Sequence, residues 1–258
     1  MWTKQSNLMY EEMTACKMRM SNIYREFDKQ IKERCLDLLD LFYPRFCIGC
    51  GETLIRKETD LCLSCLMELP IITESYKSDN FIEKRFYGRA KVESAASFLY
   101  YEKETMSQKI LHEIKYQGNK ELGRRLGKMF GSRLNGVVFN DVDALVPVPL
   151  HPHKLKLRGY NQSEWIAKGM AEAMNRPVWS DIIERTIENS TQTKKNAYER
   201  WENVKGIFQL TNKRNVENRH LLIVDDVLTT GSTLEACILP LKDIKNIKIS
   251  VATLAAVN

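Results

Sequence analysis

The segment 221–233, LLIVDDVLTTGST, constrains the fold more than any other part of the chain. Four apolar residues run directly into two carboxylates, Asp225 and Asp226, and a hydroxyl-rich loop with one glycine follows. A continuous apolar run bounded by polar turn residues is typical of a strand buried on both faces of a parallel sheet. Because helix-compatible residues come next, the segment predicts a strand–loop–helix unit of an α/β fold.

The chemistry of this segment suits a phosphorylated sugar. Backbone N–H groups and hydroxyls at the start of a helix favour a phosphate. The carboxylates suit ribose hydroxyls or Mg²⁺. The alternative is an ordinary strand–helix turn with a Thr or Ser cap. The predicted ribose-phosphate loop consists of Thr229, Thr230, Gly231, Ser232 and Thr233.

Four of the seven cysteines form a second motif. Two C-x-x-C pairs separated by eleven residues allow four thiolates to surround one Zn²⁺ ion. Disulfides and a redox pair are the alternatives, and a cytosolic setting disfavours the disulfides. The site has no open ligand position, so a structural zinc module is predicted, with the ligands Cys47, Cys50, Cys62 and Cys65.

The spacing of apolar residues and the positions of prolines divide the chain into three parts. Residues 1–30 form an N-terminal extension with no clear period, compatible with disorder; 31–70 hold a helix and the zinc module; 71–258 form the α/β domain. Within that domain 71–86 is expected to be a linker and 89–101 a strand pair. Further strands are expected at 144–148, 221–224 and 247–255, and helices at 28–42, 104–117, 119–134 and 161–175.

Two polar segments are candidates for contacts with the rest of a phosphorylated ligand. After the strand at 144–148 the chain enters a basic loop, 150–158, whose Lys154 and Arg158 could bind a pyrophosphate. A solvated basic loop is the alternative. Residues 185–206 lack an apolar stripe and suit a lid over the ligand, or else a simple connection.

A basic run at 109–128 has a different character. Tyr116 lies within it, and only Glu113 and Glu121 oppose its cations. Such a run could follow a single-stranded DNA backbone and stack a base, but taken alone it favours the alternative, an exposed helical face. Its basic residues are Lys109, Lys115, Lys120, Arg124, Arg125 and Lys128.

Composition is compatible with a cytoplasmic protein. The formal charge of +6 allows anionic ligands without requiring them. No stretch approaches the roughly 20 apolar residues of a membrane span, and charged residues near the N-terminus argue against a signal peptide.

Taken together, these motifs resemble the ComF family of bacterial competence proteins. The resemblance rests on the cysteine module, I-K-Y-x-G-x-x-x-L at 114–122, VPVPLHPHKLKLRGYNQS at 146–163, TQT-x5-ER-x2-NVKGIF at 191–208, and 221–233. It implies a zinc ribbon followed by a type I phosphoribosyltransferase-like domain that binds phosphoribosyl pyrophosphate (PRPP) with Mg²⁺. It also implies a role in DNA uptake, beside a helicase partner in some species.

The resemblance assigns the motif residues their expected roles. Asp225 and Asp226 would meet the ribose diol, the 229–233 loop the 5-phosphate, 150–158 the pyrophosphate, and 190–206 would be the lid. Two functions remain open: a nucleic-acid-handling protein of the uptake machinery, and an active transferase that passes phosphoribose to a nucleobase or amine.

Overall fold

The computed structural model describes residues 42–135, 139–187, 206–211 and 214–258. The chain divides into two compact units, Met1–Leu66 and Met67–Asn258. The predicted extension at 1–30, and all but the last residue of the predicted helix at 28–42, lie outside the described residues.

The described part of the first unit is a loop-rich module around the four cysteines. An antiparallel bridge joins Phe46 to Thr53, and the short helix α2, Leu63–Met67, starts beside Cys62. Gly51 has a φ of 82°. This left-handed conformation suits glycine, and it lets the chain turn sharply after the first C-x-x-C pair.

The core of the second unit is a four-stranded parallel sheet with strand order β1-β6-β5-β2. Its strands are β1 (Ala95–Tyr101), β2 (Ala144–Pro147), β5 (His220–Leu228) and β6 (Lys248–Val257). In β5 the residues from His220 to Asp226 are all buried. The predicted parallel sheet is confirmed, and β5 lies inside it with a neighbour on each side.

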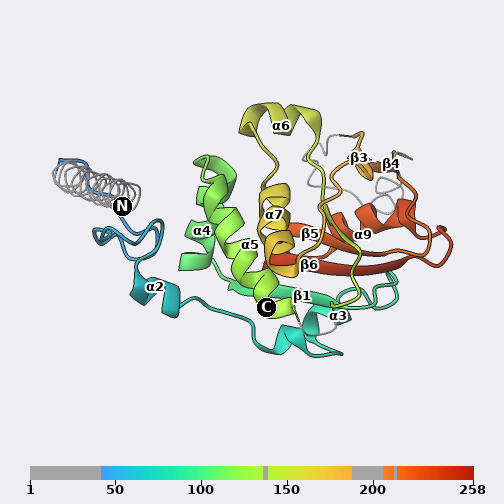
Figure 1. Ribbon diagram of the computed structural model, residues 1–258, viewed down its shortest axis with the longest axis horizontal. Helices are drawn as coiled ribbons and strands as arrows, with labels where there is room; N and C mark the ends of the chain where they lie inside the picture. The colour runs from blue at the N-terminus through green and yellow to red at the C-terminus, as the bar shows by residue number, and fades with distance from the viewer. Residues whose placement is uncertain (1–41, 136–138, 188–205, 212–213) are drawn as a thin grey trace, which may run out of the picture. The chain divides into compact units, whose positions relative to one another are not determined.

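Three helices cover one face of this sheet (Figure 1). They are α4 (Met106–Tyr116), α5 (Lys120–Leu134) and α7 (Gln162–Met174). Phe130 of α5 stacks on Phe98 of β1, with ring centres 5.4 Å apart. All three helices lie where the sequence predicts them.

The opposite face is covered by shorter elements. They are α3 (Phe81–Lys84), α9 (Ser232–Ile238), the 3-10 helix η2 (Leu239–Leu241) and the antiparallel pair β3 (Ile183–Arg185) and β4 (Phe208–Leu210). They form one apolar cluster with Leu221 and Ile223 of β5. Since side chains alternate along a strand, Leu222 and Val224 face the other way.

Helices α5 and α7 approach one another through glycines. A Cβ atom on Gly169 would lie 1.9 Å from the carbonyl oxygen of Arg124, and one on Gly127 would lie 2.3 Å from the carbonyl oxygen of Ile166. Only glycine permits backbones this close. The contact fixes α7, whose first residues reach the site described below.

Two predictions for residues 71–101 are wrong. Residues 71–86 are not a linker: they hold the 3-10 helix η1 (Glu74–Tyr76) and α3, and Ile72, Ile82 and Phe86 are fully buried. Their few apolar residues are scattered among polar ones, so the sequence shows no apolar pattern in this segment. The segment 89–101 contains one strand, β1, because it pairs with the distant β6 rather than with itself.

Candidate functional site

The acidic pair lies within β5. The strand continues to Leu228, beyond the predicted end at Val224, and Asp225 is paired with Thr253 of β6. Both carboxylates are buried, with 8% of Asp225 and 5% of Asp226 exposed. Two adjacent carboxylates with so little water contact need compensating partners.

Asp226 finds its partners on two helices. Its Oδ2 atom accepts a hydrogen bond of 2.7 Å from Nε2 of Gln162, at the start of α7. The ammonium of Lys115, in the last turn of α4, lies 3.2 Å from the same oxygen. Oε1 of Gln162 is buried and has no hydrogen-bond partner within the described part of the chain. The site thus contains an acceptor that lacks a donor.

Asp225 is held by neutral donors. Its Oδ1 atom accepts hydrogen bonds of 2.9 Å from the Ser163 hydroxyl and 2.9 Å from the backbone N–H of Asp226. Burial, followed by the charge of Asp226, raises the pKa of Asp225 to about 7, although these donors and Lys115 oppose the rise. Near neutral pH the carboxyl is therefore poised between its two protonation states.

Asn161 anchors the start of α7 beside this pair. Its side-chain oxygen accepts from the N–H of Ser163 at 3.1 Å, and its Nδ2 donates to the carbonyl of Val148 at 3.0 Å. This cap ties the helix to the end of β2 and directs Gln162 and Ser163 toward β5. The sequence analysis did not predict that Gln162 and Ser163 contact the carboxylates.

The predicted ribose-phosphate loop follows β5 and leads into α9. Gly231 has a φ of 82° and precedes the first residue of the helix. The hydroxyls of Thr230 and Ser232 lie 3.0 Å apart. Four of the five loop residues, Thr229, Thr230, Ser232 and Thr233, are exposed. The loop therefore presents hydroxyls to solvent next to the buried carboxylates.

Two arginines hold this loop, Arg85 from the end of the supposed linker and Arg89 just after it. Arg85 donates to the carbonyls of Thr229 and Val257. Arg89 donates to the carbonyl of Thr230 at 2.6 Å and pairs with Glu235 of α9 at 2.6 Å. The sequence analysis missed both residues, and their only signal is two arginines four apart before a strand.

Lys154 and Arg158 lie on a helix, not in a loop as predicted. The helix α6, Pro152–Arg158, is capped by His151, whose side chain accepts from the N–H of His153 at 3.3 Å. Gly159 ends it in the left-handed conformation. None of its residues is buried, so the sequence lacks the apolar stripe that reveals a helix. In Figure 1 α6 projects from the body of the unit.

The basic run at 109–128 is divided among several contacts. Lys115 belongs to the acidic pair, and Arg124 pairs with Glu172 at 2.6 Å and Glu121 at 3.2 Å. The Lys120 ammonium lies 4.8 Å from the centre of the Trp165 ring. The run is thus not one uniform face. The predicted lid at 190–206 lies outside the described residues except for Gly206.

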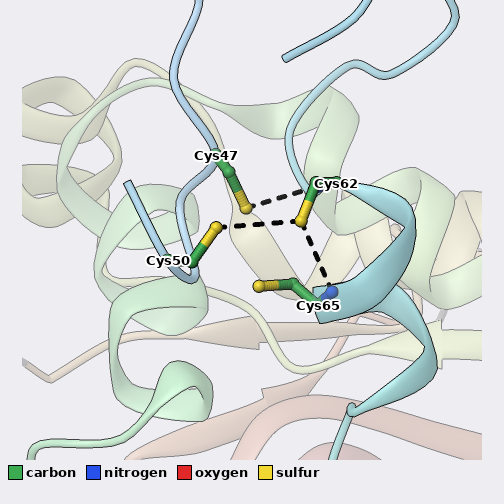
Figure 2. Close-up of side chains that lie close together, drawn as sticks. All are labelled: Cys47, Cys50, Cys62 and Cys65. Carbon is green, nitrogen blue, oxygen red and sulfur yellow. Dashed lines mark hydrogen bonds between the residues drawn. The ribbon is translucent and has the colours of Figure 1, made fainter. Parts of the chain in front are cut away.

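The four cysteines converge as the spacing predicts (Figure 2). Their sulfur atoms all lie within 4.8 Å of one another, and those of Cys50 and Cys62 are 3.7 Å apart. Four sulfurs at about 2.3 Å from one tetrahedral Zn²⁺ would be about 3.8 Å apart. The residues present therefore fit a zinc ion.

The sulfur atoms also have the donors that thiolates need. The N–H of Cys62 donates to the sulfur of Cys47 at 3.2 Å, and the N–H of Cys65 to that of Cys62 at 3.5 Å. Burial acts to raise the pKa of Cys47, but backbone N–H groups, that of Cys62 foremost, lower the pKa to about 6. At Cys47 the metal-binding thiolate is thus favoured.

Fold and site together define a protein with a phosphoribosyltransferase fold and a four-cysteine zinc ribbon. Two family models agree with this class. The double zinc ribbon domain matches residues 38–76, and the phosphoribosyl transferase domain matches residues 163–258. The described residues contain one four-cysteine cluster.

Curated proteins of the same kind are similar over part of the chain. Competence protein F of Haemophilus influenzae is 36% identical over 93 residues, which are 36% of this chain and 41% of that protein. DNA utilization protein YhgH of Escherichia coli K12 is 30% identical over 131 residues, 48% of this chain and 56% of that protein. Competence protein ComFC of Bacillus subtilis is 30% identical over 129 residues, 50% of each chain.

These matches and the two domain families agree with the resemblance to the ComF family that the sequence motifs carry. The chain spans about half the length of the curated relatives it matches. Among the described residues, none of the helices has the length and apolar character needed to cross a bilayer.

Proposed function

We propose that this protein binds the ribose 5-phosphate part of PRPP at the carboxyl end of β5, and that it acts in the handling of DNA during uptake. The observation that carries the first part is the contiguity of two buried carboxylates with the exposed hydroxyl loop at 229–233. In parallel sheets ligands bind beyond the carboxyl ends of the strands.

The hydrogen-bond donors and acceptors of the site indicate which ligand groups it can bind. Asp225, Asp226 and the unpartnered Oε1 of Gln162 are all acceptors, so they favour a group that donates, such as a sugar diol. The 229–233 loop offers hydroxyls and N–H groups, which favour a phosphate. Lys154 and Arg158 would attract the pyrophosphate of PRPP, together with any Mg²⁺ that it carries.

The test of this site is a calorimetric titration with ribose 5-phosphate and with 2-deoxyribose 5-phosphate. The double variant Asp225→Asn with Asp226→Asn should weaken ribose 5-phosphate binding by about tenfold or more, since hydrogen bonds to charged groups contribute about 1.5–3 kcal/mol each. The deoxy sugar should bind less tightly than ribose 5-phosphate to the unaltered protein. Equal affinity for both sugars and both proteins would place the ligand elsewhere.

Transferase activity is the second candidate, favoured by the retention of both carboxylates beside the loop. A transferase would position PRPP and stabilise the departing pyrophosphate while a nucleobase or amine attacks the sugar. Release of pyrophosphate from PRPP in the presence of nucleobases or ammonia is the measurement. Binding of PRPP without any such release would identify a ligand-binding protein.

The part concerning DNA rests on the relatives, two of which carry the word competence in their names and one DNA utilization. Two rings beside cations, the exposed Tyr116 and the half-buried Trp165, offer a matching surface on this chain. Trp165 has the ammonium of Lys168 4.8 Å from its ring centre, as well as that of Lys120. Arg158 lies 5.2 Å from the ring centre of Tyr116. Such rings can stack bases while the cations neutralise phosphates.

The DNA surface can be tested apart from the sugar site. Changing Lys120 and Lys168 to Ala should weaken single-stranded DNA binding and reduce the magnitude of its salt slope by about 0.7 for each lost phosphate contact. Ribose 5-phosphate affinity should stay the same, because neither residue touches the acidic pair. In a transformable host the same change should lower DNA uptake. A salt slope equal to that of the unaltered protein would contradict this surface.

A further inference from the structure

Lys115 is the one cation that the described residues bring onto the acidic pair. Its ammonium lies 3.2 Å from Oδ2 of Asp226, and 20% of its side chain is exposed. The contact depends on the long-range fold: Tyr160 donates to the carbonyl of Ile114, so the end of α4 is tied to the segment that enters α7. Lys115 is thus held on Asp226 by the scaffold.

The place of this ammonium conflicts with a metal ion bound directly to the pair. Mg²⁺ needs near-octahedral oxygen ligands at about 2.0–2.1 Å and keeps several waters. At Asp226 the ammonium and the amide of Gln162 already occupy Oδ2, and a second cation would be repelled by the first. The acidic pair with Lys115 in place does not fit a directly coordinated divalent ion.

We propose that Lys115 takes the place of a metal ion at the acidic pair, as a fixed positive charge that keeps Asp226 oriented toward the sugar. Lys115 is a positioning residue in this account. The diol is then bound without a divalent cation, and Mg²⁺ matters only for the pyrophosphate of PRPP. This inference rests on the proposed function for the identity of the ligand, but not for the role of Lys115 as the charge partner of Asp226.

The sugar experiment separates the two sources of metal dependence. Ribose 5-phosphate carries the diol and the phosphate but no pyrophosphate, so its affinity for the unaltered protein should be the same with Mg²⁺ or with a chelator. Lys115→Met keeps the length of the side chain and removes its charge. Without Mg²⁺ this variant should bind ribose 5-phosphate about tenfold more weakly, the effect expected for losing one charged hydrogen bond. Adding Mg²⁺ should restore much of the loss.

A metal titration gives a readout that needs no sugar. With its ammonium removed, the pair has two carboxylates and no fixed cation, so Lys115→Met should gain a Mn²⁺ site that paramagnetic resonance can detect. Adding Asp226→Asn to that variant should abolish the site. Lys109→Met, on the exposed side of the same helix, is the matched control and should bind no additional Mn²⁺.

The outcomes distinguish this inference from the proposed function. If the unaltered protein binds no ribose 5-phosphate but Lys115→Met gains the Mn²⁺ site, the proposed ligand is wrong and the role of Lys115 stands. If Lys115→Met gains no Mn²⁺ site, or if sugar binding by the unaltered protein requires Mg²⁺, the inference is overturned. Lys115→Arg, which keeps the charge, should gain no Mn²⁺ site, and this result shows that charge rather than helix packing is responsible.

Discussion

At the scale of single residues, the buried Asp225 destabilises the folded state near neutral pH. Burial and the neighbouring Asp226 raise its pKa to about 7, far above the usual value of 3.8. The folded state therefore holds a proton that the unfolded chain has lost at intermediate pH. Ionisation of Asp225 therefore lowers the free energy of unfolding as pH rises from about 4 to about 7. Above that range the full loss has been reached. A raised pKa that costs stability in this way is typical of a residue retained for binding.

Asp225→Asn should remove this pH-dependent destabilisation. We expect the variant to be more stable than the unaltered protein at pH 8 by about 2 kcal/mol, with almost no difference at pH 4. Urea unfolding at the two pH values is the measurement. The exposed Asp243→Asn serves as the control and should show no comparable change in its stability difference with pH. A stability gain at pH 4 as large as that at pH 8 would contradict the assignment of the shift to Asp225.

At the scale of elements, the crossing of α5 and α7 controls the site. The two helices meet where Gly127 and Gly169 leave no room for a side chain. Because α7 begins with Gln162 and Ser163, its position decides whether these donors reach the acidic pair. A packing contact between helices is thus coupled to the geometry of the carboxylates.

Gly169→Ala should be strongly destabilising. Its Cβ would lie 1.9 Å from a backbone oxygen, so the helices must move apart, at a cost of about 1–3 kcal/mol or more. Gly123→Ala on the same helix pair is the matched control. Its Cβ would meet only side chains, those of Ile114 at 3.4 Å and Ile166 at 3.7 Å. Alanine favours a helix by about 1 kcal/mol relative to glycine, so we expect little net change. Thermal melting of both variants tests the contrast, and equal losses would refute it.

The limits of sequence prediction also lie at this scale. Strand β5 and its loop were predictable because their signals are contiguous: an apolar run, two carboxylates and hydroxyl residues in order. The contact of Lys115 with Asp226 was not, because the two residues are far apart in the chain and Lys115 sits in a basic run that resembles a solvated face. Helix α6 was hidden for another reason, since a helix with no buried residue has no apolar period.

At the scale of the whole molecule, the chain consists of two units stabilised in different ways. The second has an extensive apolar core around its sheet. The described part of the first is short, and its four cysteines are its principal means of cross-linking. A module of this size seldom folds without such a metal. The predicted cysteine ligands were accessible from sequence because their spacing alone identifies them.

Cys62→Ser should therefore affect one unit only. We expect loss of bound zinc and of ordered structure in the ribbon, because structural zinc supplies about 10–16 kcal/mol to folding. Ribose 5-phosphate binding by the second unit should persist. Elemental analysis and proteolysis of the ribbon are the measurements. Cys237→Ala, outside the cluster, should retain its zinc. Full zinc content in Cys62→Ser would disprove the assignment.

The strand order has a consequence for the growing chain on the ribosome. Strand β6 is made after all the others, yet it lies between β1 and β5. Until residue 257 has emerged, β1 has no partner in the sheet and β5 has an open edge toward solvent. Unpaired strand edges are prone to aggregate. Longer translation pauses shortly before β6 should thus reduce the yield of folded protein.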